Sequence, residues 1–250
     1  MCFHVPMTMD FTDHIRRDAA MLREVAGRDL GAAVPSCPGW TLADLLYHVG
    51  EVHELWAEIA RRGETGQPTE AEYPDPPRPS DADLPQWAAG CTERLITAID
   101  KLDPAQPLWN WSQAPKVGAF VARRMAHETA VHRVDGQLAS GTPNPIDREL
   151  AVDGIDEYLK VFLASAGAYA RAEEGAIRFA PSDHPHTWTA VLAAPGPTMH
   201  RDVGSPADLT VRGPASDVLL AMWLRDADVT FDGDESLWEA WREHVTGVNT

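Results

Sequence analysis

Apolar residues recur at helical spacing in successive segments of the first part of the chain. A first helix is predicted for residues 11–26, where the apolar side chains stand three or four positions apart. A second helix is predicted to begin at a capping box formed by Thr41 and Asp44 and to end near Gly63. Each helix has one apolar stripe to bury, so the segments are expected to pack against one another.

Two further helices complete this part of the chain. The proline-rich stretch 66–85 is predicted to be a long surface loop. A third helix is predicted from its apolar residues, which are Trp87, Cys91, Leu95 and Ile99. A fourth helix runs from about Val117 to Ala139 and ends before Gly141. Together these helices indicate a four-helix bundle, an architecture whose core often holds metal sites.

The second part of the chain mixes helices with strand-like runs. The predicted helices are Asp147–Ala168, Pro214–Arg225 and Ser236–Val245. The strand-like runs are Ala176–Phe179, His186–Leu192, Asp208–Val211 and Val229–Phe231. The fold class is therefore expected to be α+β, with a helical domain at residues 1–145 and a small α+β domain at residues 146–250.

Charge and composition exclude several classes of function. Acidic residues outnumber basic ones by 38 to 21 in 250 residues, and a formal charge of −17 repels the phosphate backbone of nucleic acids. No apolar run reaches the ~20 residues needed to cross a bilayer, and the first residues lack the pattern of a secretory signal. The three cysteines form no CxxC pair, which argues against a disulfide framework. We expect a cytoplasmic monomer or homodimer without a nucleic-acid or membrane partner.

A set of metal-type ligands is divided between the second and fourth predicted helices. Glu128 and His132 stand four residues apart, which places them roughly 40° apart on one helix face. If His48 reaches that face, the three residues offer two imidazoles and one carboxylate, a set suited to a divalent metal such as zinc. Three protein ligands leave a coordination position open for water or substrate, as a catalytic metal requires.

Each part of this ligand set also has a purely structural explanation. A Glu-x-x-x-His pair arises easily by chance in an acidic chain, and His48 taken alone is better explained as a hydrogen-bonded core histidine. A continuous polar stripe on the fourth helix favours the metal, because it runs beside apolar residues and so lies at the edge of the buried face. The stripe consists of Arg124, Glu128, His132 and Asp135.

Longer motifs surround these residues. One covers residues 37–48 (CPGWTLADLLYH), and another covers residues 124–135 (RMAHETAVHRVD). A third covers residues 211–225 (VRGPASDVLLAMWLR) and is followed by residues 231–234 (FDGD). In this order the motifs resemble the second helix, the fourth helix and the second domain of the mycothiol-dependent maleylpyruvate isomerase family.

The resemblance implies a DinB-like four-helix bundle followed by a small sterol-carrier-like α+β domain. It carries the metal-ligand role onto His48, Glu128 and His132, and a catalytic or substrate-binding role onto Arg225. The thiol cofactor that it implies beside the metal is mycothiol. The family has many members of unknown activity, so the fold does not by itself define the reaction.

The expected function is that of a mycothiol-dependent S-transferase or a maleylpyruvate isomerase-like enzyme. A metal-bound thiolate would attack a small electrophile, and either addition with elimination or displacement would follow. Arg225 has a planar, permanently charged side chain that suits an anionic substrate. Its alternative explanation is a surface arginine at a helix C-terminus, where the helix dipole favours positive charge.

Two other classes of function stay open at the level of the sequence. With water on the metal, the same site would serve a hydrolase or detoxifying enzyme, with Glu51 or Asp135 as the base. Without turnover, the protein would bind a ligand or sense a metal. Thiol-dependent turnover that is lost on chelation would separate the first class from both alternatives.

Overall fold

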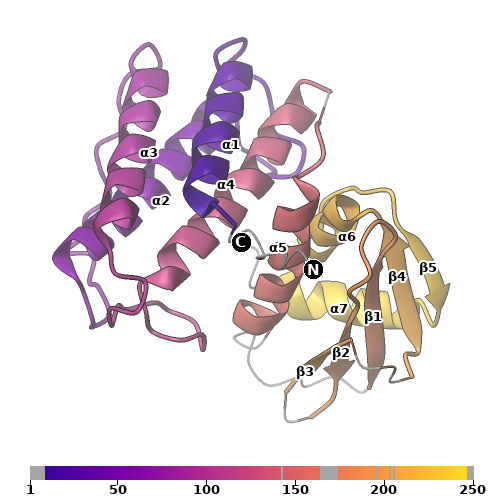
Figure 1. Cartoon of the computed structure of the whole chain (residues 1–250). Helices are drawn as coiled ribbons and strands as arrows, with labels where there is room; N and C mark the ends of the chain where they lie inside the picture. Colours follow the sequence, from indigo (N-terminus) through magenta and orange to yellow (C-terminus); the bar gives the residue numbers. More distant parts are fainter. Residues whose placement is uncertain are drawn as a thin grey trace, which may run out of the picture. The chain divides into compact units, whose positions relative to one another are not determined.

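A computed structural model describes residues 9–141, 143–163, 174–194, 196–202, 204 and 206–246 (Figure 1). The chain divides into two compact units. The helical unit contains Met1–Asn110 and Lys116–Asn144, and the α+β unit contains Trp111–Pro115 and Pro145–Thr250. Helices come first along the chain, and a sheet with further helices follows, so the predicted α+β class is confirmed.

In the described ranges, four long helices form the helical unit as a bundle. They are α1 (Phe11–Ala26), α2 (Leu42–Arg62), α3 (Leu84–Lys101) and α4 (Ala119–Ala139). α1 packs mainly against α4, and α2 packs mainly against α3. The proline-rich residues between α2 and α3 form no helix or strand, as their composition predicts.

The two ends of α2 follow from its sequence. Thr41 Oγ1 accepts a hydrogen bond from the backbone N–H of Asp44 at 3.3 Å, and Asp44 Oδ2 accepts one from the N–H of Thr41 at 2.9 Å. These reciprocal bonds form the predicted capping box. Gly63 ends the helix at a φ of 65°, a left-handed conformation that glycine adopts without steric cost. The capped helix holds His48 in a defined position on its face.

α4 is buried around most of its circumference, and its buried surface includes charged residues. Gly136 lets α1 approach closely, because a Cβ at this position would lie 2.5 Å from Cδ1 of Leu22. Arg133 is buried in an ion pair with Asp18 of α1, with its Nε atom 3.0 Å from a carboxylate oxygen. α4 therefore carries polar side chains into the interior of the bundle, where partners hold them in place.

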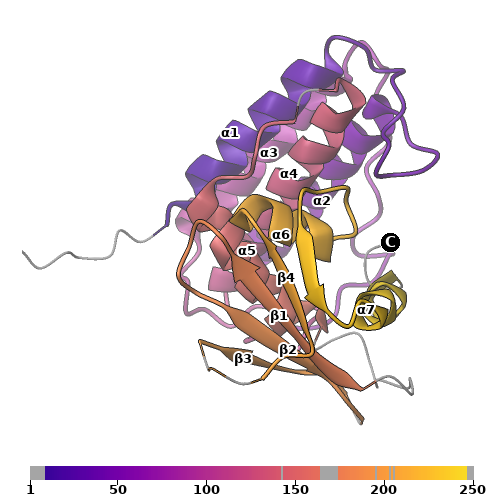
Figure 2. The ribbon, with the colours of Figure 1, turned by 90° about the vertical axis from the view of Figure 1, so that its right-hand side faces the viewer.

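The α+β unit contains one mixed sheet and three described helices. The helices are α5 (Arg148–Val161), α6 (Ala215–Met222) and α7 (Ser236–Thr246). The strands are β1 (Gly175–Pro181), β2 (Trp188–Leu192), β3 (Thr198–Arg201), β4 (Leu209–Gly213) and β5 (Thr230–Gly233). Their order across the sheet is β3-β2-β1-β4-β5 (Figure 2), and only the β1–β4 pair is parallel. α6 packs on β1 and β4, and α7 packs on β1.

The sequence prediction differs from this unit at several places, and the helix predicted to reach Arg225 ends at Met222. β3 was not expected, because its short and largely exposed sequence has no apolar alternation. The helix predicted to reach Ala168 ends at Val161, and residues 164–168 lie outside the described part. β2 begins at Trp188 instead of His186, because its pairing with β1 starts at Trp188, opposite Phe179. Within the described part of the chain, no helix is long and apolar enough to cross a membrane.

Candidate metal centre

The three residues predicted as metal ligands lie together in the helical unit. His48 projects from α2, and Glu128 and His132 project from successive turns of α4. Glu128 Oε1 is 3.5 Å from Nε2 of His48 and 3.2 Å from Nε2 of His132. One donor atom from each residue lies within 4.8 Å of the others, although the residues are far apart in sequence. Their role as metal ligands stays a prediction, and we call the cluster the candidate metal centre.

A second carboxylate contacts each of the two imidazole rings. Nδ1 of His48 is 3.1 Å from Oε1 of Glu51, and Nδ1 of His132 is 2.9 Å from Oδ2 of Asp135. When Nδ1 donates its proton to a carboxylate, the Nε2 lone pair is free to bind a metal. Glu51 and Asp135, which we call the outer carboxylates, therefore hold both rings in an orientation that suits metal binding.

Glu128 is oriented by Arg124, which lies one turn earlier on α4. An Nη2 atom of Arg124 donates to Oε2 of Glu128 at 3.0 Å, and the other oxygen faces the two imidazoles. Burial acts to raise the pKa of Glu128, but His132, His48 and Arg124 together hold it well below the usual value. Glu128 is thus an anion, with one oxygen held by Arg124 and one available to a cation.

The charges around the imidazoles fit a divalent cation. Burial acts to lower the pKa of His132, but Glu128 and Asp135 outweigh it and raise the pKa to about 9. Among the described residues, three carboxylates contact the rings and the guanidinium of Arg124 contacts Glu128, so the negative charge in these contacts exceeds the positive when both rings are neutral. The site stabilises added positive charge, and its two nitrogens and one oxygen are ligands that zinc accepts.

Residues of the turn before α2 contact Asp135, one of the outer carboxylates. Ser36 Oγ donates to Oδ1 of Asp135 at 2.6 Å, and Cys37 Sγ lies 3.8 Å from Oδ2. Cys37, His132 and Asp135 themselves offer donor atoms within 4.8 Å of one another. Asp135 accepts bonds from several partners and so acts as a support for His132. The contacts of Ser36 and Cys37 with Asp135 could not be predicted from residue spacing, because they join residues almost 100 positions apart.

The other histidine of α2 has a different environment. Nδ1 of His53 is 3.2 Å from Oγ1 of Thr92, and Nε2 is 2.9 Å from Oγ1 of Thr129. Burial lowers the pKa of His53 to about 4, so the ring is neutral in the bundle core. His48 instead packs against the edge of Trp40, with a ring-centroid distance of 5.1 Å. His53 is therefore a core histidine, whereas His48 belongs to the candidate metal centre.

Arg225 lies in the α+β unit, directly after α6. Its guanidinium donates from Nη1 to the carbonyl oxygen of Trp223 at 2.7 Å, at the C-terminal end of the helix. The side chain also lines a cavity of about 280 Å³ together with Phe231 and Trp238. The hydrogen bond to Trp223 is what an arginine that only caps the C-terminus of a helix would make, and the cavity leaves room for an anionic group. A role of Arg225 in substrate binding stays a prediction.

The fold and the centre together define a class of protein in which a helical bundle with a metal-type ligand cluster precedes an α+β unit. Residues 11–136 match the mycothiol maleylpyruvate isomerase N-terminal domain, and residues 149–240 match the MDMPI C-terminal domain. These matches cover most of the chain. The chain belongs to the mycothiol maleylpyruvate isomerase family, and it is an enzyme of that family.

Solved structures have the same fold over most of their length. A crystal structure of the mycothiol-dependent maleylpyruvate isomerase is 14% identical in sequence, with a TM-score of 0.64 over 89% of this chain and 91% of that chain. A histidine-to-alanine mutant of that isomerase gives a TM-score of 0.63, with the same identity and coverage. At this identity the likeness establishes the fold alone. Among curated proteins, no sequence matches this chain.

Proposed function

We propose that the protein is a metal- and mycothiol-dependent isomerase or S-transferase that acts on a small electrophile. The observation that carries this proposal is the convergence of Nε2 of His48, Nε2 of His132 and Oε1 of Glu128. Membership of a family named for a mycothiol enzyme supports the use of a thiol. The outer carboxylates add support, because rings held in this way are typical of metal-binding histidines.

The protein's own residues would prepare the centre for a thiol. His48, Glu128 and His132 would hold the metal, and a position for a further ligand would remain open. A divalent metal supplies the positive charge that lowers the pKa of a thiol bound beside it. Arg124 keeps one oxygen of Glu128 turned towards the imidazoles. Trp40 packs against the His48 ring and helps to hold the imidazole in place.

The choice between isomerase and transferase depends on the substrate. Mycothiol supplies a sulfur nucleophile, which isomerises a double bond by addition, rotation and elimination, or forms a thioether by displacing a leaving group. We propose that Arg225 binds an anionic group of the substrate or the thiol. Its half-buried guanidinium presents several N–H donors in one plane, the geometry that suits a carboxylate.

A metal-dependent hydrolase has less support from the centre. Such an enzyme needs a base that can take a proton from water, and the sequence offers Glu51 and Asp135 for that role. Both carboxylates already accept hydrogen bonds from imidazole rings, and Asp135 also accepts one from Ser36. These bonds already engage the carboxylate oxygens that would have to accept a proton from water.

The test is turnover of two electrophiles, monochlorobimane and maleylpyruvate, with and without mycothiol. We expect turnover that requires the thiol, is lost when a chelator removes the metal, and returns when zinc is added. Monochlorobimane reports S-transfer and maleylpyruvate reports isomerisation, so the pair also separates the two reactions. Hydrolysis without the thiol would favour the hydrolase instead. Binding of either compound without turnover would contradict both enzyme proposals.

A further inference from the structure

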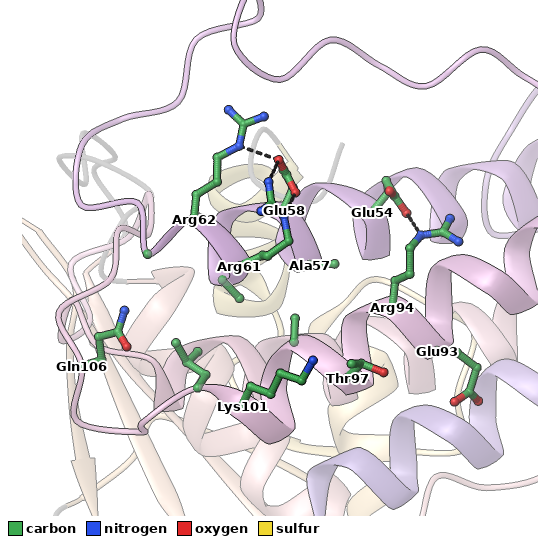
Figure 3. A pocket seen from close by; sticks show the side chains of 14 residues that line it. Glu54, Ala57, Glu58, Arg61, Arg62, Glu93, Arg94, Thr97, Lys101 and Gln106 are labelled. Carbon is green, nitrogen blue, oxygen red and sulfur yellow. Dashed lines mark hydrogen bonds and ion pairs between the residues drawn. The ribbon is translucent and has the colours of Figure 1, made fainter.

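A cavity of about 560 Å³ lies between α2 and α3, where the C-terminal halves of the two helices face each other (Figure 3). We call it the α2–α3 cavity. Its volume lies in the range of ligand pockets, which is roughly 300–1,000 Å³. Ala57, at its lining, stands nine residues after His48 on α2, which corresponds to roughly 14 Å along the helix axis. The cavity is therefore separate from the candidate metal centre.

Small apolar side chains form part of the cavity lining. Ala57 and Ala60 lie on α2 and are almost fully buried, and Ala98 and Leu102 belong to α3 and the residue after it. Because the alanines carry only a methyl group, the space between the helices is left unfilled. Burying an apolar ligand group here would remove apolar surface from water, which is favourable.

The charged side chains of the lining contain more positive than negative charge. Arg61 and Arg62 share the single carboxylate of Glu58, and the Arg61 Nε atom lies 2.6 Å from it. One carboxylate cannot neutralise two guanidiniums, so this group keeps a positive charge. Arg94, by contrast, forms an ion pair with Glu54, in which its Nε atom lies 2.8 Å from a carboxylate oxygen, so these two charges cancel.

Lys101 adds to this excess. Its ammonium group extends towards the open space of the cavity, as Figure 3 shows, and it makes no ion pair with any residue that the structure describes. Glu93, the remaining acidic residue of the lining, lies 3.8 Å from Arg16. The cavity is therefore locally positive in a chain whose formal charge is −17.

We propose that the α2–α3 cavity binds a small organic anion with an apolar body, such as an aromatic carboxylate. The apolar body would lie against Ala57, Ala98 and Leu102. The anionic group would lie beside the ammonium of Lys101, where unlike charges attract. A positive pocket in an acidic protein selects for anions, because the rest of the surface repels them.

The experiment is a fluorescence titration of the full chain with 8-anilinonaphthalene-1-sulfonate, which joins an aromatic body to an anionic group, followed by displacement with benzoate. Lys101→Met removes the charge and keeps the length of the side chain, and it should weaken binding about fivefold. Ala98→Phe fills the cavity without changing any charge and should weaken binding by about tenfold or more. Lys160→Met removes the same charge from α5, outside the cavity, and should leave the affinity unchanged.

Thermal unfolding of each variant checks that it is folded. The proposal is supported if both cavity variants weaken binding, if the Lys160→Met control does not, and if added salt weakens binding by the parent protein. Equal affinities in the parent, Lys101→Met and Ala98→Phe proteins would overturn it, and so would failure of benzoate to displace the probe. Thiol-dependent turnover should be unchanged in Lys101→Met, because this residue lies outside the candidate metal centre.

Discussion

α2 contributes to the candidate metal centre near its start and to the α2–α3 cavity near its end. The two regions have opposite charge, since carboxylates outnumber cations around His48, and cations outnumber carboxylates around Ala57. They also differ in how they are held together. The centre joins His48 of α2 to Glu128 of α4, which is distant in sequence, whereas Glu58 pairs with arginines three and four residues away.

This difference predicts that the two ends of α2 respond differently to substitution. In the centre, burial strengthens each electrostatic contact and leaves little freedom for the side chains. In the cavity, the ion pairs are partly exposed, so each contributes little to stability and the side chains can move to meet a ligand. Changes in the centre should therefore have large effects on metal binding and turnover, and changes in the cavity should have smaller effects on anion binding.

The largest effect is expected when a metal ligand is removed. His48→Ala, Glu128→Ala and His132→Ala should each lose the metal, of which the parent should hold about one per chain, and turnover should fall on the order of 1,000-fold. Metal content by mass spectrometry and thiol-dependent turnover are the measurements. His14→Ala, which removes an imidazole from α1 outside the centre, should keep both. Full metal retention in the three ligand variants would refute the ligand assignment.

Removing an outer carboxylate should weaken metal binding without abolishing it. Asp135→Asn keeps the shape of the side chain but not its charge, and metal affinity should fall about 10- to 100-fold because the His132 ring loses its support. Glu51→Gln should act in the same way on His48. Glu24→Gln removes an exposed carboxylate of α1, outside the centre, and serves as the control. If turnover falls while metal affinity stays normal, the outer carboxylates act as bases and the hydrolase deserves renewed testing.

The α+β unit should contribute to turnover and not to metal binding. Arg225→Lys keeps the charge but loses the planar fork, and turnover should fall about tenfold with normal metal content. Arg225→Ala should have a larger effect on turnover and still keep the metal. Turnover at the parent level in both variants would mean that Arg225 only caps α6 through its bond to Trp223.

The pH dependence should distinguish the centre from the cavity. The raised pKa of His132, about 9, means that the ring is protonated at pH 7 in the absence of metal, and this proton must leave when the metal binds. Metal affinity should therefore rise about tenfold per pH unit between pH 6 and 8. The cavity lining contains no histidine, so binding of the anilinonaphthalene probe should be flat over this range. Calorimetric titrations at several pH values test both statements, and a metal affinity that falls as pH rises would contradict the first.

The smallest effect is expected from Glu58, the carboxylate shared by two arginines. Glu58→Gln leaves both guanidiniums without a counter-charge, so the probe should bind about threefold more tightly. The free energy of unfolding should fall by less than ~1 kcal/mol, because exposed ion pairs contribute little. Probe titration, denaturant unfolding and metal content are the three measurements. Weaker probe binding would contradict the charge argument for the cavity.

The helices of the bundle and the composition of the centre could be predicted from sequence because their signals are local. Apolar spacing marks α1 and α2, and the capping box at Thr41 marks the start of α2. The pair Glu128 and His132 needs only the helical repeat, and the family resemblance adds His48. His53 lies about one and a half turns from His48 and so points elsewhere, but only the structure reveals the two threonines that make it a core histidine.

The remaining features depend on contacts that no sequence window contains. β3 is held by its pairing with β2, and its own residues carry no alternating pattern. The support of Asp135 by Ser36 joins the turn before α2 to α4. The positive charge of the α2–α3 cavity arises because side chains from two helices meet. Arg61 on α2 is paired with a nearby glutamate, and nothing in the sequence around Lys101 on α3 indicates a binding site. Only the structure shows that both residues line the same cavity.

Gly136 shows how a residue without a functional group can limit the variation that this enzyme tolerates. It follows Asp135 directly on α4, and the space that its Cβ would occupy is filled by Leu22 of α1. A larger residue must displace the buried Leu22 side chain or α4 itself, and a movement of α4 would shift the carboxylate that orients His132. A deep mutational scan scored on thiol-dependent turnover should therefore rank Gly136 among the metal ligands in its intolerance of substitution.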